Sequence, residues 1–518
     1  MSTWAIILLV LAGLIVVVVI YDVLQRRHAI LHNFPIIGHF RYMLEAVGPE
    51  LRQYIVTGND DERPFSRNQR RWVYASAKRE DNTFGFGTDT AFERNPGHLI
   101  VRNAAFPEPA PIVEHGPYYA VPCAKIVGAA RGRRHAFRPP SIVGISGLSF
   151  GALSGNAIAA LNAGAKIAGC LQNTGEGGLS VYHQQGGQLI FQLGTGYYGC
   201  RDARGRFSLD RLVAVCAENP VRAIEVKLSQ GAKPGVGGLL PAKKVTAEIA
   251  RARGVPAGCD CSSPAGHAEF RDVDSMLEFI ERIADATGLP VGIKSAVGEV
   301  EFWDELAEQM LATDRGVDFV TIDGGEGGTG AAPLVFTDHV ALPYVQAHAT
   351  AYRSFAMRGM AHQIVFVGSG RLGLPESALL AFGLGADIVH VGREAMLSIG
   401  CIQAQRCHTD RCPSGVATQS AWLQRGLDPT LKSVRLANYV SVLRREIVAL
   451  ARTCGYPHPA FVTLDQFAFL DGTVMSPATD RFDLLPSWCR PDHEDLEEIA
   501  AIMRSERIGS DRSGTAIG

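Results

Sequence analysis

The chain has 518 residues, of which 47% are hydrophobic and 20% are charged, and its formal net charge is −2 at pH 7. This length allows one large domain with additional segments. The sequence pI of about 6.7 argues against a nucleic-acid partner, since domains that bind nucleic acid through a basic surface usually exceed a pI of about 9. Eleven cysteines in so long a chain do not make a disulfide scaffold and favour a reducing compartment.

Residues 1–22 are predicted to form an N-terminal transmembrane anchor. No charged residue occurs from Trp4 to Ile20, and a helix of that length measures about 26 Å, close to the thickness of a bilayer core. The basic residues that follow, 26–28, predict a single-pass protein of the inner or plasma membrane with a cytoplasmic catalytic domain. A cleaved signal peptide is an alternative, although the sequence lacks its basic start and cleavage site. A buried hydrophobic arm is the third.

Residues 23–140 show no repeated strand–helix unit. Arginine-rich (63–79) and proline-rich (107–111) stretches indicate a lead-in segment that wraps the main domain and turns its basic residues toward solvent or lipid headgroups. Residues 455–518 are predicted to be an irregular C-terminal extension that ends in a charged helix (493–508) and a frayed Gly/Ser tail.

Residues 141–454 are predicted to have an α/β fold, a (β/α)8 TIM barrel. Short apolar runs that end in glycine or polar residues alternate with amphipathic segments, a pattern typical of parallel sheets. Functional groups would then collect at the C-terminal ends of the strands. The predicted helices include 273–288, 302–311 and 376–386. The predicted strands are 142–146, 166–172, 222–228, 290–296, 318–325, 364–370 and 387–393.

The sequence GSGRLG at 368–373 follows a predicted strand and precedes a predicted helix, which indicates a phosphate-binding turn. A dinucleotide fold would place an acidic residue at the end of the next strand, where this chain has Gly392 and Arg393. The barrel site for a single phosphate, after the last two strands, suits a mononucleotide such as FMN better. Because an arginine could accept a 2′-phosphate, a nicotinamide site stays open.

Lys294 lies at the end of a predicted apolar strand, where an unpaired buried charge would be costly. It would either face the N1/O2 edge of a flavin and stabilise the reduced ring, or form a salt bridge across the top of the barrel.

Cys401, Cys407 and Cys412 are spaced C-x5-C-x4-C and predict a metal centre. Three thiolates without a fourth cysteine nearby suit a [3Fe-4S] cluster. Zinc with His408 as its fourth ligand is an alternative, although neighbouring residues rarely converge on one ion. Inert thiols are the other alternative.

The string LSIGCIQAQRCHTDRCPSGVATQ, at 397–419, resembles the cluster loop of the glutamate synthases. NTGEGG (173–178), QGAKPG (230–235) and GGEGGTGAAP (324–333) resemble that family's flavin and 2-oxoglutarate loops. The resemblance runs in consistent order from about Val143 to Leu450. It implies an oxidoreductase that converts 2-oxoglutarate through 2-iminoglutarate to L-glutamate with reduced FMN and a [3Fe-4S] cluster.

The resemblance also implies roles for matching residues. Gln230 and Lys233 would face the dicarboxylate and the flavin, and Glu176 would lie between substrate, flavin and the cluster-side loop as a polar link for protons. The implied cofactor-binding residues are Ser149, Gly151, Lys294, Gly328, Thr329, Gly330, Gly368, Ser369, Gly370, Gly392 and Arg393.

Several features depart from the family pattern. Ser2 and an apolar run stand where full-length synthases have a glutaminase cysteine, and no C-terminal β-helix domain is expected. We therefore expect ammonia or another amine from outside, with an amidotransferase partner as one source and a separate electron donor. Val236 stands where a glutamate is expected, and the 263–270 segment keeps only His267 of a double-histidine pattern.

Two alternative functions stay open. One is the condensation of another amine with a keto acid by a subunit of a larger complex. The other is a non-catalytic, membrane-tethered flavin and iron–sulfur redox sensor. The presence of Glu176, Gln230 and Lys233 favours chemistry, because a mere electron carrier needs no dicarboxylate site.

Overall fold

The computed structural model describes residues 2–25, 29–51, 58–83, 85–88, 90–92, 95–109 and 119–513. The chain divides into two compact units, Met1–Arg70 and Arg71–Gly518. The predicted barrel lies in the second unit, and each unit is described by itself.

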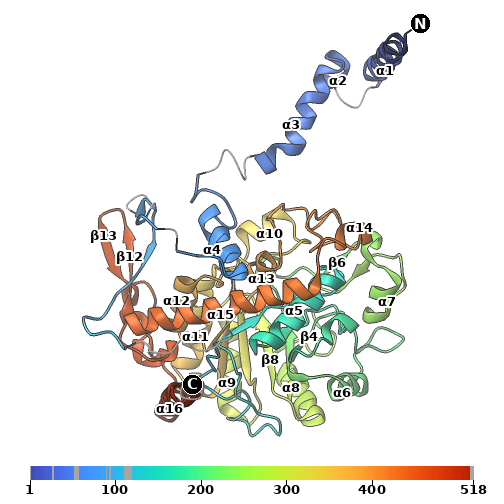
Figure 1. Cartoon of the computed structure of the whole chain (residues 1–518). Helices are drawn as coiled ribbons and strands as arrows, with labels where there is room; N and C mark the ends of the chain where they lie inside the picture. Colours follow the sequence, from blue (N-terminus) through green and yellow to red (C-terminus); the bar gives the residue numbers. More distant parts are fainter. Residues whose placement is uncertain are drawn as a thin grey trace. The chain divides into compact units, whose positions relative to one another are not determined.

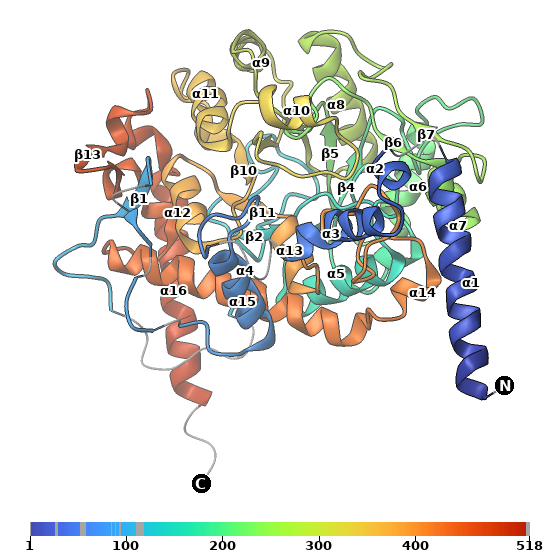
Figure 2. The ribbon, with the colours of Figure 1, turned by 90° about the horizontal axis from the view of Figure 1, so that it is seen from above.

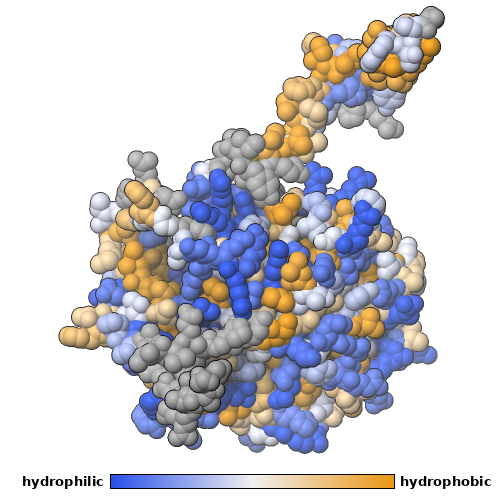
Figure 3. Space-filling view, viewed as in Figure 1, coloured by the Kyte–Doolittle hydropathy of each residue, from blue (hydrophilic) through white to orange (hydrophobic). Residues whose placement is uncertain are grey.

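The first unit contains the helices α1 (Thr3–Leu24), α2 (Ala29–Asn33) and α3 (Ile37–Leu51). Among the described residues, α1 is the helix whose length and composition would allow it to cross a membrane. Its large apolar side chains are exposed on all sides, as in a membrane span, and apolar residues dominate the N-terminal helices in Figure 3. A membrane anchor and a signal sequence both match this helix. The basic residues 26–28, on which the predicted orientation rests, lie outside the described residues.

The second unit is built on a closed, eight-stranded parallel barrel, which confirms the predicted fold class. Each strand pairs with the next, and the last pairs with the first. In barrel order the strands are β2 (Val143–Ile145), β3 (Gln172–Asn173), β4 (Leu189–Leu193), β5 (Val221–Lys227), β8 (Val291–Ser295), β9 (Phe319–Asp323), β10 (Val365–Ser369) and β11 (Ile388–Val391).

Two strands differ from the sequence prediction. The strand predicted at 166–172 is wrong for its first half, because α5 (Gly155–Ala168) continues until Gly169 ends it in a left-handed conformation. Only Gln172–Asn173 pair as β3. β4, with the sequence LIFQL, was not predicted from the sequence. All five of its residues are buried in the structure.

Helices surround the barrel (Figures 1 and 2). Among the predicted ones, α8 (Val273–Thr287) begins at a capping box of Asp272 and Ser275 and ends at Gly288. The long α15 (Pro429–Thr453) packs closely against α5, where a Cβ at Gly164 would lie 2.7 Å from the Ser433 carbonyl oxygen. The other helices outside the strands are α6 (Leu209–Glu218), α7 (Ala247–Arg253), α9 (Glu301–Ala312), α10 (Leu334–His339), α11 (Tyr344–Ala356), α12 (Pro375–Gly383), α13 (Arg393–Ser398), α14 (Ala421–Gln424) and α15 (Pro429–Thr453).

The lead-in segment supplies the floor of the barrel. Val127 and Phe137 pair as an isolated antiparallel bridge, and both are buried. With Cys123 they pack against residues from the N-terminal half of the barrel interior. We call residues 123–137 the plug. Its barrel partners are Leu171, Ile190, Ala223, Phe319, Val365, Val367 and Ile388.

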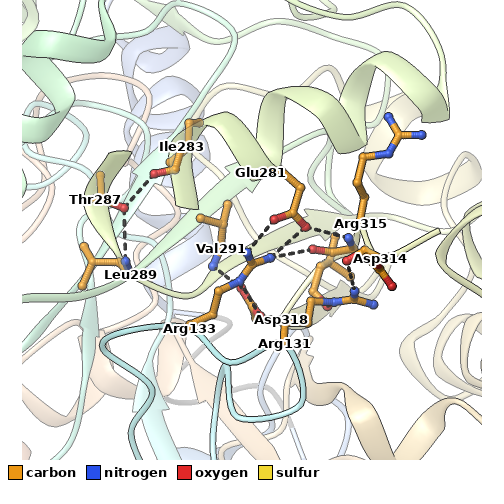
Figure 4. A network of polar contacts seen from close by, with 12 residues as sticks. Arg131, Arg133, Glu281, Ile283, Thr287, Leu289, Val291, Asp314, Arg315 and Asp318 are labelled. Atoms are coloured by element: carbon orange, nitrogen blue, oxygen red, sulfur yellow. Dashed lines mark hydrogen bonds and ion pairs between the residues drawn. The ribbon is translucent and has the colours of Figure 1, made fainter. Parts of the chain in front are cut away.

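Arg133 clamps the plug onto the barrel (Figure 4). Its Nε donates to both carboxylate oxygens of Asp318, at 3.0 and 3.1 Å, and its Nη2 donates to Glu281 on α8 at 2.9 Å. Asp318 also accepts from the Val291 N–H at 2.7 Å. Burial raises the pKa of Asp318 to about 6, although Arg133 favours its ionised form. The clamp therefore joins the lead-in, α8 and two strands in one polar network.

The expectation that the lead-in arginines face solvent is wrong at Arg70. This residue lies on α4 (Arg67–Lys78), is buried, and pairs with Glu62 at 2.6 Å. A nearby carboxylate permits the burial because it compensates the lost hydration of the guanidinium.

The prediction of an irregular C-terminal extension is also wrong in part. β12 (Phe467–Asp471) pairs with β13 (Val474–Pro477) and with β1 (His98–Val101), so the lead-in and the C-terminal extension share an antiparallel sheet. A second small sheet pairs β6 (Leu239–Leu240) with β7 (Cys261–Ser262). The predicted charged helix is present within α16 (His493–Ser513), and residues 110–118 and 514–518 lie outside the described residues.

Candidate active site

A polar layer lies above the apolar floor of the barrel. Glu225 on β5 is fully buried and accepts hydrogen bonds from Asn173 Nδ2 (2.7 Å), Gln192 Nε2 (2.7 Å) and Thr321 Oγ1 (2.6 Å). Strand alternation places these side chains inside the barrel, two residues further along than the apolar ones. The three donors compensate the buried carboxylate and link strands β3, β4, β5 and β9.

An ion pair lies at the C-terminal end of the strands. Lys294 Nζ is 3.4 Å from Asp323 Oδ2, and Asp323 also accepts from Ser369 Oγ at 2.8 Å and from the Gly231 N–H at 2.9 Å. Burial alone would lower the pKa of Lys294, but Asp323 and Glu225 outweigh it and raise that pKa. Lys294 is thus a fixed cation. The salt bridge expected as one alternative is present.

A neighbouring pocket brings together the three residues predicted to be catalytic, Glu176, Gln230 and Lys233. As a cavity it measures only about 20 Å³, and about 290 Å³ when the solvent-open space at its mouth is included. Lys227, which the sequence analysis missed, bridges the group. Its Nζ is 3.0 Å from Glu176 Oε1 and donates to Gln230 Oε1 at 3.0 Å. The remaining lining residues are Thr195, Leu228, Ser229, Gly235, Val236, Gly237, Gly238, Pro264 and Ala265.

The charges in this pocket fix the protonation of Glu176. Burial would raise the pKa of its carboxyl group, but Lys227 and Lys233 lower it to about 2. Lys233 Nζ lies 4.0 Å from Glu176, and burial lowers the pKa of that lysine. At neutral pH Glu176 is therefore a carboxylate, and the proton-handling role expected of it stays a prediction.

His267 contacts the backbone of Lys227, one of the pocket residues. Its Nε2 is 2.9 Å from the Lys227 carbonyl oxygen, and its Nδ1 is 3.2 Å from the Tyr197 hydroxyl. Burial lowers the pKa of His267, so the imidazole is neutral at pH 7. A neutral ring donates from Nε2 to the carbonyl and fixes the backbone that carries Lys227.

The residues predicted to bind phosphate end two neighbouring strands, β10 and β11. Gly370 has a φ of 136°, which favours glycine. Within the described part of the chain, the N–H groups of Gly370 and Gly392 have no hydrogen-bond acceptor. Two unpaired donors at this place suit a phosphate. Gly368 and Ser369 lie on β10, and the Ser369 hydroxyl is already bonded to Asp323.

Arg393 contacts the glycine loop that was predicted to approach the flavin. A Cβ at Gly328 would lie 2.6 Å from Arg393 Cδ, and Arg393 Nη2 donates to the Glu326 carbonyl oxygen. Thr329 Oγ1 accepts from the Ala331 N–H at 3.3 Å within the same loop.

On the other side of the mouth, the loop that carries Ser149 lies against the NTGEGG loop. A Cβ at Gly175 would lie 2.7 Å from the Ser149 nitrogen. Gly151 has a φ of 101°, a conformation that side chains strain. Both loops thus bring their backbone close to the mouth. Together with the unpaired donors of Gly370 and Gly392 and the fixed charge of Lys294, these loops fit a mononucleotide such as FMN.

The loop that carries Cys401, Cys407 and Cys412 is adjacent to the glycine loop 324–333. The three thiols do not converge on one point. Cys401 and Cys407 are half-buried and Cys412 is buried. Across the residues that the structure describes, no three Cys, His, Asp or Glu side chains converge closely enough to hold a metal ion. A Cβ at Gly330 would lie 3.1 Å from Cys407 Cβ. Iron–sulfur cluster, zinc and inert thiols all stay predictions.

Comparison with known proteins identifies the family. The conserved region in glutamate synthase matches residues 133–457. The chain belongs to the glutamate synthase family. This is a family of oxidoreductases, and the resemblance found in the sequence is confirmed.

Relatives of this glutamate synthase family member match different shares of the chain. The glutamate synthase large subunit-like protein YerD of Bacillus subtilis (strain 168) is 36% identical over 88% of this chain and 93% of its own length. The archaeal glutamate synthase [NADPH] of Methanocaldococcus jannaschii is 35% identical over 60% of this chain and 58% of its own length. A mutant flavocytochrome b2 with benzoylformate has a TM-score of 0.44 and 13% identity, over 90% of this chain and 92% of its own.

Sequence reasoning missed two functional groups of this glutamate synthase family member, Lys227 and Glu225. Both lie on β5, at alternate positions of the predicted strand 222–228, and both point into the barrel. The signal was available, because charged residues two apart in an apolar strand share one face. What the sequence could not show is that the loop bearing Glu176 folds onto that face.

Proposed function

We propose that this protein reductively aminates 2-oxoglutarate to L-glutamate with FMN and takes its nitrogen from ammonia supplied from outside. The observation that carries the proposal is the convergence of Glu176, Lys227, Gln230 and Lys233 in one pocket at the barrel mouth. The similarity to an archaeal glutamate synthase [NADPH] supports it.

The pocket charge suits a dicarboxylate substrate. Two ammonium groups and one carboxylate leave one positive charge, so an anion enters favourably. Lys233 would pair with a substrate carboxylate and Gln230 would donate to the substrate from its amide. Glu176, ionised at neutral pH, would hold the two lysines in place and accept a hydrogen bond from the incoming amine.

The fit of the loops favours FMN as cofactor. Gly370 and Gly392 would donate to its phosphate, and the backbone of Ser149–Gly151 and Gly328–Gly330 would lie near its ring. Lys294 would face the N1/O2 edge as a fixed cation. When bound, FMN supplies a hydride.

The chemistry that falls to the protein is the formation of the imine. Ammonia adds to the keto carbon, water leaves, and 2-iminoglutarate is reduced at that carbon to L-glutamate. Burial lowers the pKa of Lys233, which suits this lysine to give the proton that departs with water.

The other expected components are proposals of the same kind. Cys401, Cys407 and Cys412 would bind a [3Fe-4S] cluster, supported by their spacing and by the contact of Cys407 with Gly330. The amination above does not depend on it. A separate electron donor, an amidotransferase partner and attachment of the cytoplasmic catalytic unit to the inner or plasma membrane through α1 complete the proposal.

One observation favours a second candidate, the condensation of another amine with the keto acid. Val236 lines the pocket and presents an apolar surface. An alkyl substituent on the amine would bury against such a surface, whereas ammonia gains nothing from it.

The test is product analysis with the full-length protein in detergent, supplied with reduced FMN and 2-oxoglutarate. Ammonium should yield L-glutamate, and methylamine in its place should yield N-methylglutamate if the second candidate holds. Lys233→Met should lower kcat/KM at least tenfold, about 1.4 kcal/mol. Lys243→Met, an exposed lysine outside the pocket, is the matched control. Failure of both amines to give product would contradict both enzyme proposals and favour the redox sensor.

A further inference from the structure

A second pocket, distinct from the proposed substrate pocket, is lined by four arginines. It lies between the β3–α6 region and α7 and has a cavity volume of about 210 Å³. Arg211 on α6 and Arg251 on α7 are exposed at its rim, Arg201 is half-buried, and Arg253 is buried. We call this the arginine pocket. Its other lining residues are Leu179, Gly199, Val215, Ala252 and Gly254, so no carboxylate lines it.

The positive charge of this pocket is uncompensated. None of the four arginines forms an ion pair within the described part of the chain. Their contacts are with neutral groups: Arg211 Nη1 donates to the Arg201 carbonyl oxygen at 2.7 Å, and Arg253 Nη2 donates to the Phe150 carbonyl oxygen at 3.2 Å. Four like charges held together without a paired carboxylate repel one another, and an anion would relieve that repulsion.

Two of the arginines also keep unused donors. The Nε atoms of Arg201 and Arg253 are buried and have no hydrogen-bond partner. Both side chains lie near the ring of Tyr198, with the guanidinium carbons of Arg201 and Arg253 at 5.5 and 5.2 Å from its centroid. Arg253 is only 5% exposed, so its unpaired donor carries a real desolvation cost in the absence of a ligand.

We propose that the arginine pocket binds a small polyanion that carries carboxylate or phosphate groups. Guanidinium groups match both kinds of oxyanion in pairs of hydrogen bonds, and the size of the pocket suits a metabolite. This site is separate from the 2-oxoglutarate pocket and does not rest on the proposed reaction.

Arg253 connects the arginine pocket with the loops of the barrel mouth. Its Nη2 would lie 3.1 Å from a Cβ at Gly177 and 3.3 Å from one at Gly151. Its charge also helps to lower the pKa values of Glu176 and Lys233. An anion bound to Arg253 would weaken that field, so occupancy of the arginine pocket would change the electrostatic environment of Glu176.

The test is calorimetric titration of the full-length protein in detergent with inorganic pyrophosphate and, separately, with malonate, at constant ionic strength. The two arms distinguish a phosphate ligand from a dicarboxylate. Saturable binding of at least one probe is expected. The double variant Arg211→Gln and Arg251→Gln should weaken it at least tenfold.

The matched control is the double variant Arg204→Gln and Arg206→Gln. It removes the same amount of charge from two exposed arginines in a neighbouring loop. It should change the affinity less than twofold. Absence of binding by both probes, or equal losses in the two double variants, would overturn the proposal. So would loss of binding in Lys227→Met but not in the arginine variant, because the anion would then occupy the substrate pocket. Unchanged thermal midpoints establish that the variants are folded.

Discussion

Glu176 owes its properties to its two lysine neighbours. A carboxyl group buried alone would hold its proton, but Lys227 at 3.0 Å and Lys233 at 4.0 Å make the ionised form the stable one. At 4.0 Å, Glu176 compensates only part of the charge of Lys233, and a substrate anion would compensate the rest. The pocket is thus poised between an internal salt bridge and a bound dicarboxylate.

This pairing predicts a pH dependence of stability. The pKa of Glu176 is about 2 in the folded chain, below its ordinary value of 4.5. Its contribution, about 3 kcal/mol, is therefore present above pH 4.5 and is lost as the pH falls toward 2. Glu176→Gln should lower the thermal midpoint at pH 7, and the difference from wild type should shrink between pH 5 and pH 3.

Glu278→Gln, an exposed glutamate on α8, serves as the control and should leave the midpoint nearly unchanged across this range. A difference for Glu176→Gln that stays constant from pH 7 to pH 3 would show that the carboxylate is not stabilised by the lysines.

At the scale of elements, the lead-in acts as part of the barrel rather than as a wrapping. Arg133 binds Asp318 and Glu281, and its side chain is only 8% exposed. Breaking a buried pair by removing one partner usually costs about 3–5 kcal/mol, because the remaining carboxylates stay buried.

We therefore expect Arg133→Met to lower the thermal midpoint of the full-length protein strongly. Arg134→Met is the matched control, because Arg134 is exposed and makes one long hydrogen bond, 3.4 Å, to the Asp285 carbonyl oxygen. Equal midpoints for the two variants in differential scanning calorimetry would show that the clamp does not stabilise the fold.

The cysteine loop gives the second prediction at this scale. Protein purified without oxygen should contain iron and acid-labile sulfide, and Cys407→Ser should lose most of both, since each iron of the cluster needs one protein sulfur. Cys259→Ser, which changes an exposed cysteine outside the loop, should keep them. Wild-type protein with zinc and no iron would contradict the cluster.

The sequence predicted the elements whose signal is local. The alternating strands and helices of residues 141–454 predicted the barrel, and the glycine run at 368–373 marked the end of β10, where the Gly370 N–H has no acceptor among the described residues. It could not predict pairings between distant segments. The short β1 pairs with β12, which lies more than 360 residues later in the chain, and nothing in the four residues of β1 indicates that pairing. The pairing of Lys227 on β5 with Glu176 could not be predicted for the same reason, since Glu176 lies on a loop about 50 residues earlier in the chain.

At the scale of the whole molecule, α1 predicts the cellular fraction in which the protein is found. The full-length chain should remain with membranes after an alkaline wash, and a variant that lacks residues 2–25 should be released. The intact mass of the purified protein distinguishes a membrane anchor from a signal sequence, because an anchor is retained and a signal sequence is removed. Full-length protein in the soluble fraction would contradict both.

Residues 123–137 leave the ribosome before any strand of the barrel does, yet the full set of their packing partners exists only when β11 has been made. Until then the apolar surface that covers Val127 and Phe137 is incomplete. The same order limits how the protein can be shortened. A recombinant fragment that starts at residue 141 keeps all eight strands but opens the apolar end of the barrel to water, and it should aggregate. A fragment that starts at residue 119 keeps both the plug and Arg133, and should remain soluble.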